Sequence, residues 1–167
     1  GRDRPSRIGL AMSVSRHFTW AEVTGSRVAS ARGINNALPE YLKPEAEAQA
    51  ELMERIRAAL DAPIIVSSWF RCGALNWAVR RPNAGPGIDN SGDHPKAAAT
   101  DFTAPGFGMP LEVCRLLAPR VDELGIGQLI YEGAWTHVSK NAPFKPVNRI
   151  ITLLPGGAGY AAGIVEV

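Results

Sequence analysis

Apolar residues recur at intervals of three and four along two stretches of the chain, which is the spacing of amphipathic helices. The first stretch, residues 44–60, has these apolar positions on one face: Ala48, Leu52, Met53, Ile56, Ala59 and Leu60. The second, residues 110–124, has on one face Val113, Leu117, Val121 and Leu124. Pro44 is expected to open the first helix, and Pro119 to kink or split the second. Shorter helices are expected at the capping-box sequence of residues 19–22 and over residues 75–80.

Shorter apolar runs bounded by turn residues predict five strands: 64–68, 99–103, 128–132, 135–139 and 149–154. The first of these strands is expected to be buried. The third and fourth form a hairpin joined by Gly133-Ala134, because glycine in the first place of a two-residue loop suits a tight type II′ turn. Helices come first and mainly antiparallel strands follow, so the predicted fold class is α+β, with N-terminal helices packed on a small, mainly antiparallel sheet.

The domain organisation is expected to be simple. A chain of 167 residues can bury the core of one domain. We expect residues 16–167 to form that domain and residues 1–15 to be an N-terminal extension. The chain begins with glycine and Met12 is a candidate natural start, so part of residues 1–11 is expected to remain from cloning or processing. The apolar stretch at residues 8–14 is interrupted by Gly9 and Ser13, which predicts that no signal peptide is present.

Composition argues against several classes of protein. Hydrophobic residues make up 46% of the chain and charged residues 20%, which is typical of a globular domain. A net charge of +2 with scattered arginines predicts no nucleic-acid partner, and no apolar run reaches the roughly 20 residues of a membrane span. Cys72 and Cys114 form neither a CxxC motif nor a zinc-finger spacing, so two unpaired thiols are favoured, with a disulfide as the alternative. A monomer is the expected oligomeric state.

Three polar residues in the second half of the chain have the chemistry of a metal site. His94 and Asp101 lie in a loop and the strand after it, and His137 lies in the second strand of the expected hairpin. Zinc binds imidazole and carboxylate groups, and three protein ligands leave one tetrahedral position open for water, as in catalytic sites. Taken singly, each residue also has a structural explanation, as a surface loop residue, a strand end and a half-buried histidine. The remaining histidine, His17, is assigned a structural role at the entry to the first helix.

A carboxylate is expected beside this site. If Glu132 pairs with Trp135 across the hairpin, then Ile130 pairs with His137, and the four side chains share one face of the sheet. Glu132 is then a diagonal neighbour of His137, where a carboxylate can act as a general base. The alternative interpretation of Glu132 is a charge that flanks the turn.

Three segments, taken together, resemble the zinc D-Ala-D-Ala carboxypeptidases and the related phage peptidoglycan endopeptidases: VSSWFRCGALN (66–76), DHPKAAATDF (93–102) and QLIYEGAWTHVS (128–139). That family has a strand ending in Ser-Gly-Tyr-Arg with an Asn a few residues on, then Ser-x-His-x-x-Gly-x-Ala-x-Asp, and later Trp-x-His. The N-terminal sequence HFTWAEVTGS also looks like the phage-type branch, so the resemblance covers residues 16–140.

The resemblance implies roles for particular residues and a zinc ion (Zn2+) as the cofactor. The residues that match the zinc ligands are His94, Asp101 and His137. Arg71 matches the substrate-binding arginine, which grips a substrate carboxylate or polarises the carbonyl. Asn76 matches a structural or substrate-facing position, and Trp135 matches an aromatic residue of the substrate cleft.

The chain departs from the family pattern at five positions: Trp69 and Phe70 for Gly and Tyr, Gly92 for Ser, Ala97 for Gly, and Ala134 for the catalytic carboxylate of many members. The last departure matters most, because it removes the usual general base. Glu132 is the best substitute on the hairpin argument above, and Asp93, next to His94, is the reserve.

The implied function is zinc-dependent hydrolysis of peptide bonds in peptidoglycan stem peptides or crosslinks, by a DD-carboxypeptidase or an endopeptidase of the endolysin type. The alternative is a non-catalytic virion or cell-wall-binding module that keeps a structural metal, which Ala134 favours and the lack of a fourth ligand opposes. A metal-free interaction domain is a third hypothesis. Without a signal peptide, the protein is expected to be made in the cytoplasm and to act at the bacterial cell wall or periplasm, as a phage-encoded or virion-associated enzyme.

Overall fold

The structure, a computed structural model, describes residues 12–167, so the expectation for residues 1–11 lies outside the described part of the chain. The α-helices of the described part are α2 (Trp20–Thr24), α3 (Arg27–Arg32), α4 (Lys43–Leu60), α5 (Gly73–Arg80), α6 (Pro110–Leu117) and α7 (Val121–Leu124). The strands are β1 (Ile65–Ser68), β2 (Ala99–Thr103), β3 (Gln128–Tyr131), β4 (Thr136–Ser139), β5 (Ile150–Leu153) and β6 (Tyr160–Ala162).

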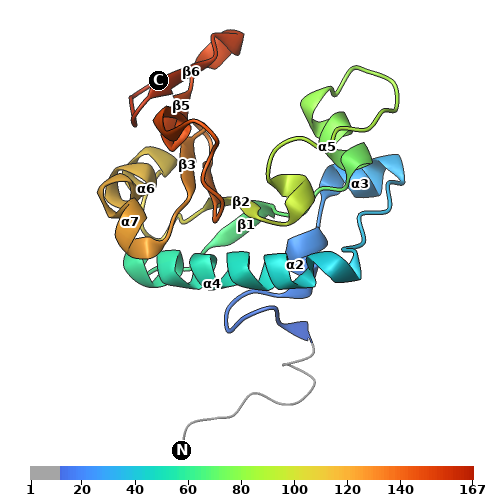
Figure 1. Cartoon of the computed structure of the whole chain (residues 1–167), viewed down its shortest axis with the longest axis horizontal. Helices are drawn as coiled ribbons and strands as arrows, with labels where there is room; N and C mark the ends of the chain where they lie inside the picture. Colours follow the sequence, from blue (N-terminus) through green and yellow to red (C-terminus); the bar gives the residue numbers. More distant parts are fainter. Residues whose placement is uncertain (1–11) are drawn as a thin grey trace, which may run out of the picture.

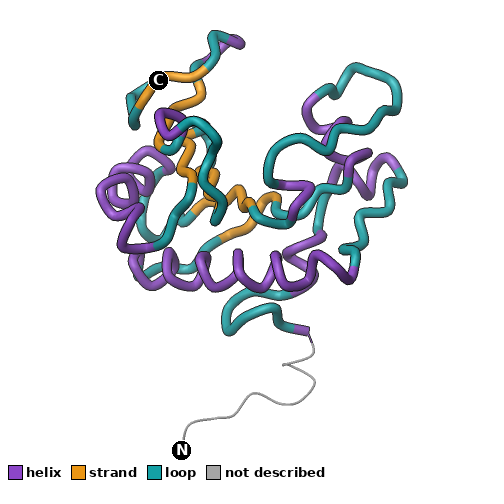
Figure 2. The backbone as a smooth tube through the Cα atoms, viewed as in Figure 1, coloured by secondary structure: helices purple, strands orange, loops and turns teal. Residues whose placement is uncertain are grey.

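The six strands form one sheet in the order β1-β2-β4-β3-β5-β6. Neighbouring strands are antiparallel except for β3 and β5, which are parallel. The long helix α4 runs along one side of this sheet, and α6 and α7 lie near the C-terminal end of α4 (Figures 1 and 2). The structure therefore confirms the predicted α+β class with a mainly antiparallel sheet.

The sequence signals at the helix ends act as expected. Thr19 caps α2, since its Oγ1 accepts a hydrogen bond from the Glu22 backbone N–H at 3.2 Å while the Glu22 carboxylate accepts one from the Thr19 N–H at 3.0 Å. Pro44 lies in the first turn of α4, where its missing N–H has no intrahelical partner to lose. Pro119 lies in a 3-10 turn that separates α6 from α7, as the kink prediction requires.

Strand β1 differs from its prediction. It was expected to be buried, yet it lies at the edge of the sheet, where Ile65 is 55% exposed and Ser67 is exposed. An apolar run predicts a strand, but its burial depends on which neighbours it acquires, and β1 has only β2. Helix α3 and strand β6 were not predicted, because both are short and neither has a periodic apolar face.

Several smaller expectations can be compared with the described residues. His17 contacts the Glu54 carboxylate of α4 at 2.9 Å, which is consistent with a structural role at the helix entry. Cys72 and Cys114 are both free thiols. No helix in residues 12–167 combines the length and the apolar character needed to cross a membrane.

The alternation of side chains along β2 and β4 separates a core face from a functional face of the sheet. Thr100 and Val138 point toward α4, where the fully buried Gln49 donates hydrogen bonds to Thr100 Oγ1 and to the Val138 carbonyl, both at 3.2 Å. The side-chain oxygen of Gln49, Oε1, accepts a third hydrogen bond, from the Lys140 backbone N–H at 2.9 Å. The residues next in line, Asp101 and His137, consequently face the opposite side.

Replacing Gln49 with methionine, a side chain of similar size, is expected to lower the free energy of unfolding by about 1–3 kcal/mol. The change leaves buried polar groups on β2 and β4 without their hydrogen-bond partner. Urea unfolding followed by circular dichroism measures this change. The matched control is Glu47→Met, at an exposed position of the same helix. Equal stability of the two variants would mean that α4 is held by apolar packing alone.

Two arms rise from the sheet on the side away from α4 (Figure 1). One arm consists of α5 and the loop after it, residues 81–93. The other arm consists of β5 and β6. In Figure 1 the first arm stands at the upper right and the second at the upper left, with β1 and β2 between them.

Candidate metal centre and cleft

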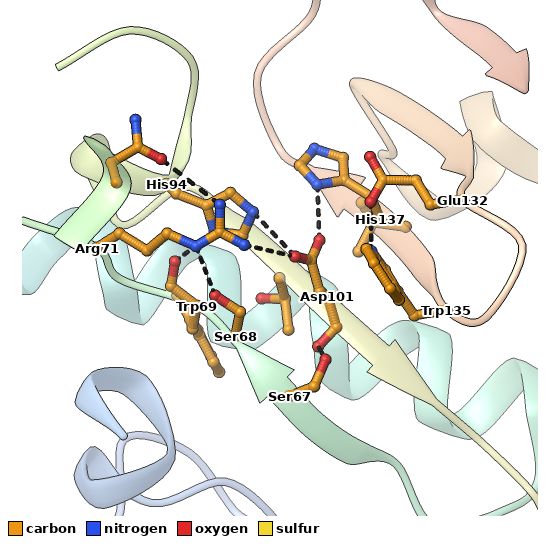
Figure 3. A network of polar contacts seen from close by, with 12 residues as sticks. Ser67, Ser68, Trp69, Arg71, His94, Asp101, Glu132, Trp135 and His137 are labelled. Carbon is orange, nitrogen blue, oxygen red and sulfur yellow. Dashed lines mark hydrogen bonds and ion pairs between the residues drawn. The ribbon is translucent and has the colours of Figure 1, made fainter. Parts of the chain in front are cut away.

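The structure brings His94, Asp101 and His137 together, with one ligand atom of each lying within 4.8 Å of the others. Asp101 on β2 and His137 on β4 are direct partners in the antiparallel register, which explains why His137 Nδ1 lies 2.8 Å from Asp101 Oδ1. His94 comes from a 3-10 turn (His94–Lys96) at the end of the loop arm, and its Nε2 lies 3.3 Å from Asp101 Oδ2. Figure 3 shows the three side chains converging from these elements.

The orientation of His94 is set by its second ring nitrogen. Nδ1 lies 2.5 Å from the Trp69 carbonyl oxygen, which can only accept a hydrogen bond, so Nδ1 carries the proton and Nε2 keeps its lone pair. Burial lowers the pKa of His94, which also favours the neutral imidazole. A metal ion binds the neutral form, so this histidine is prepared to act as a ligand.

Asp101 and His137 influence each other's pKa through the contact between them. Burial by itself would raise the pKa of Asp101, but its contacts with His94 and His137 lower it well below its usual range. Burial likewise opposes protonation of His137, yet the hydrogen bond and charge of Asp101 outweigh it and raise its pKa. A metal ion that binds here has to displace the proton that these two residues share.

Arg71 lies beside this centre and is 13% exposed. Its guanidinium donates from Nη2 to Asp101 Oδ2 at 3.0 Å and from Nε to Ser68 Oγ at 2.9 Å. Its position follows from the chain path, because Arg71 lies three residues after β1 and its backbone N–H donates to the His94 carbonyl at 3.2 Å. Burial lowers the pKa of Arg71, against the charges of Asp101 and Glu132 that raise it. The side chain thus orients a candidate ligand and still faces the cleft.

Asn76 on α5 is buried, and its amide is already engaged. Nδ2 donates to the carbonyls of Asp89 and Ser91 at 3.0 and 3.1 Å, and Oδ1 lies 3.5 Å from Arg71 Nη1. Of the two roles that the sequence left open, structural or substrate-facing, these contacts favour the structural one. Asn76 positions the loop arm and Arg71, and we propose no direct substrate contact for it.

Glu132 and Trp135 lie where the hairpin argument places them. Ile130 is the register partner of His137, as predicted, and the Glu132 N–H donates to the Trp135 carbonyl at 3.1 Å. Gly133 has a φ of +77°, a value that favours glycine, so the glycine is required by the turn. The Trp135 indole N–H donates to the Glu132 carboxylate, which holds it next to His137 (Figure 3). Burial raises the pKa of Glu132, and the charge of Asp101 adds to this effect.

Asp93, the reserve candidate for the base, has its carboxylate occupied. Oδ2 accepts a hydrogen bond from Ser139 Oγ at 2.8 Å, and Oδ1 lies 3.5 Å from Asn141 Nδ2 and 3.8 Å from Lys96 Nζ. These contacts tie the turn that carries His94 to the end of β4. Asp93 is therefore better suited to positioning His94 than to moving a proton.

Three of the residues that depart from the family pattern are buried. Trp69 is fully buried, and its indole N–H donates to the Ala97 carbonyl at 3.0 Å, so it braces the turn behind His94. Phe70 is buried in the core, and its N–H donates to the Val23 carbonyl at 2.9 Å. Ala97 adopts a left-handed conformation with φ +56°, which explains why glycine suits this position in other sequences.

The candidate metal centre lies in a cleft of about 540 Å3 between the two arms. The cleft is lined by the three candidate ligands, by Arg71, Glu132 and Trp135, and by residues of both arms. Sequence reasoning missed Asn148, Ile151 and Tyr160, which form the wall on the β5–β6 side. Burial and the charge of Glu132 raise the pKa of Tyr160, so its phenol remains a hydrogen-bond donor. Only the unpredicted pairing of β6 with β5 brings this tyrosine to the cleft.

The donor set fits a divalent metal ion. Two imidazoles and one carboxylate suit zinc and similar transition metals, and three protein ligands are the number found at catalytic zinc sites. The hydrogen bond from His94 to the Trp69 carbonyl and the contact of Arg71 with Asp101 are the supporting interactions that ligands at such sites usually have. These residues can therefore hold a metal ion that stays accessible to a substrate.

Comparison with known proteins gives one result. A family model described as Peptidase M15 matches residues 16–139, a range that includes the three candidate ligands, Arg71 and Glu132. No curated protein and no solved structure gives a match. The arm formed by β5 and β6 lies beyond the matched residues.

Proposed function

Because the chain belongs to the peptidase M15 family of metallopeptidases, we propose that it is a zinc-dependent hydrolase of peptide bonds in bacterial peptidoglycan. The observation that carries this proposal is the buried set of His94, Asp101 and His137 at the floor of a cleft that also contains Glu132. The peptidoglycan substrate comes from the resemblance of the motifs to wall-degrading members of that family.

The chain's residues divide the chemical work between them. Zinc held by the three ligands supplies a Lewis acid, which polarises a carbonyl group and makes water acidic enough to ionise near neutral pH. Glu132 takes the proton from the attacking water and passes it to the leaving amine nitrogen. Its raised pKa suits this exchange, because a carboxylate with a higher pKa is a stronger base. Trp135 keeps Glu132 in place through its indole N–H.

Arg71 supports the reaction from the opposite side of the centre. Its guanidinium has five N–H donors, and those not used by Ser68, Asn76 and Asp101 can bind a substrate carboxylate or the oxyanion that forms on the carbonyl oxygen. Such a charge-assisted hydrogen bond is strongest where charge develops in the transition state.

Replacing Arg71 with lysine is expected to lower kcat/KM by about 10²-fold, because the compact ammonium lacks the planar fork of donors with which a guanidinium reaches Asp101, Ser68 and substrate together. Zinc affinity is expected to fall by about tenfold to 100-fold, since Arg71 also supports a ligand. Steady-state kinetics at saturating zinc and a competitive chelator titration separate the two effects. The contrary result is a loss confined to zinc affinity, which would leave Arg71 with no role at the substrate.

The alternative of a non-catalytic wall-binding module loses its main support. That alternative rested on Ala134, but Glu132 lies in the cleft and supplies a carboxylate on the face of the ligands. We further propose that the protein acts at the bacterial cell wall as a phage-encoded or virion-associated enzyme, on the strength of the phage-type sequence resemblance.

Digestion of purified peptidoglycan tests the proposed function. The zinc-loaded protein is incubated with walls of several chemotypes, with and without a zinc chelator, and the soluble products are analysed by mass spectrometry. New muropeptide masses that disappear with the chelator are expected, and they identify the bond that is cut. Unchanged muropeptides with zinc-loaded protein would overturn the enzymatic proposal and favour a binding module.

A further inference from the structure

We infer that this enzyme cleaves inside a peptide, with a segment of the substrate lying extended along the free edge of β1 and a substrate carboxylate beside Arg27, and that it is not a carboxypeptidase. The inference rests on the proposed function and selects one of the two reaction classes that the function leaves open. It is carried by a second groove, by the exposed edge of β1, and by the exposed Arg27 on the opposite wall.

The cleft does not end at the candidate metal centre. A second groove, of about 610 Å3, runs between β1 and the turn that joins α2 to α3. Four residues line both hollows and so join them: Arg71, Val79, Asp101 and Trp135. One of the four is a candidate ligand, so the groove passes directly beside the reacting centre. A bound peptide therefore has room on both sides of the scissile bond.

The wall of the second groove is an unpaired strand edge. Strand β1 pairs with β2 alone, and all four of its residues line the groove. Within residues 12–167, its backbone makes no backbone hydrogen bond outside the pairing with β2. Figure 3 shows Ser67 and Ser68 on this strand, next to Asp101 and Arg71. An open edge of this kind binds an extended peptide through main-chain hydrogen bonds, and its length accommodates about four substrate residues.

The opposite wall contributes an exposed arginine to the groove. Arg27, the first residue of α3, is exposed and lines the groove. The charges at the inner end are paired, because Arg71 contacts Asp101 at 3.0 Å, and the carboxylate of Glu22 on the wall is bound to the backbone N–H and hydroxyl of Thr19. Arg27 is therefore the cation that a carboxylate of a bound peptide can meet in this groove.

This geometry separates two classes of peptidase. A carboxypeptidase binds a single residue beyond the scissile bond, so its site needs no space for further residues on that side. Here the space beyond Arg71 and Asp101 continues along β1. The open path favours cleavage of an internal or crosslinking bond, with several residues bound on each side.

Defined wall fragments test the reaction class. Zinc-loaded protein is incubated with purified crosslinked muropeptide dimers and with monomeric stem peptides that have a free C-terminus, and products are identified by mass. We expect cleavage that leaves at least two residues on each side of the bond. Release of a single C-terminal amino acid would overturn this inference and leave the proposed function intact. If no substrate gave a product, both this inference and the proposed function would be contradicted.

A charge reversal tests the second groove itself. Arg27→Glu is expected to raise KM for the wall fragments about fivefold, with kcat nearly unchanged and a smaller effect at high salt. The fold should tolerate the change, because a negative side chain suits the first turn of α3. The matched control is Arg16→Glu, an exposed arginine that lines neither groove, which should behave as wild type. Equal KM values for the two variants would rule out a substrate carboxylate beside Arg27.

Discussion

Replacing Glu132 with glutamine is expected to lower kcat by about 10²–10⁴-fold while zinc content stays unchanged. The amide keeps the size of the side chain and can still accept the hydrogen bond from the Trp135 indole, but it cannot take a proton from water. Because Glu132 is not among the candidate ligands, metal binding should be preserved. Muropeptide release measured by chromatography, with zinc measured by atomic absorption on the same sample, checks both parts.

Two controls make the Glu132 result specific. Glu47→Gln, at an exposed position of α4 far from the cleft in sequence, should leave kcat unchanged. Trp135→Phe removes the indole donor while keeping an aromatic side chain, and a partial loss of kcat is expected because the carboxylate is less well held. A fully active Glu132→Gln protein would falsify the assignment of the base and move that role to Asp93 or to another group.

Removing either imidazole of the metal centre, by His94→Ala or His137→Ala, is expected to abolish zinc binding and all turnover. Each change leaves one imidazole and one carboxylate, and two ligands do not hold zinc firmly against water or chelators. The loss should appear as a fall from about one zinc per chain to none. It should also remove the rise in melting temperature that zinc gives to the wild-type protein, since a bound ion stabilises the folded state.

The third histidine of the chain provides the matched control. His17 lies at the entry to α2 and contacts Glu54, outside the cleft. His17→Ala should therefore bind zinc normally, although it loses the contact with α4. If His17→Ala lost zinc as the other two variants do, the effect would be a general loss of structure. If His94→Ala kept its zinc, the ligand set proposed here would be incorrect.

Local patterns in the sequence were sufficient to predict most of the helices and strands. The apolar spacing of α4, the capping box at Thr19 and the break at Pro119 depend on interactions within a few residues, so they appear in the sequence as they do in the fold. The hairpin register that pairs Ile130 with His137 was predictable for the same reason, because a two-residue turn leaves only one pairing.

The candidate site could be predicted in part. The residue types and spacing of His94, Asp101 and His137, with the motif resemblance, indicated a metal site before any geometry was known. The predicted neighbourhood of Glu132 and His137 followed from the hairpin alone.

Contacts between distant segments were decided only by the tertiary structure. The burial of β1 was predicted wrongly, because its position at the sheet edge depends on strand order rather than on its own residues. The sequence left a structural and a substrate-facing role open for Asn76, and only the fold shows that its amide is engaged with the loop arm. Tyr160 reaches the cleft only because β6 pairs with β5, and the second groove exists only because α2 and α3 stand beside β1. Local sequence thus indicated most of the elements and the candidate ligands, whereas packing over long separations shaped the cleft, since such contacts leave no periodic signal in the chain.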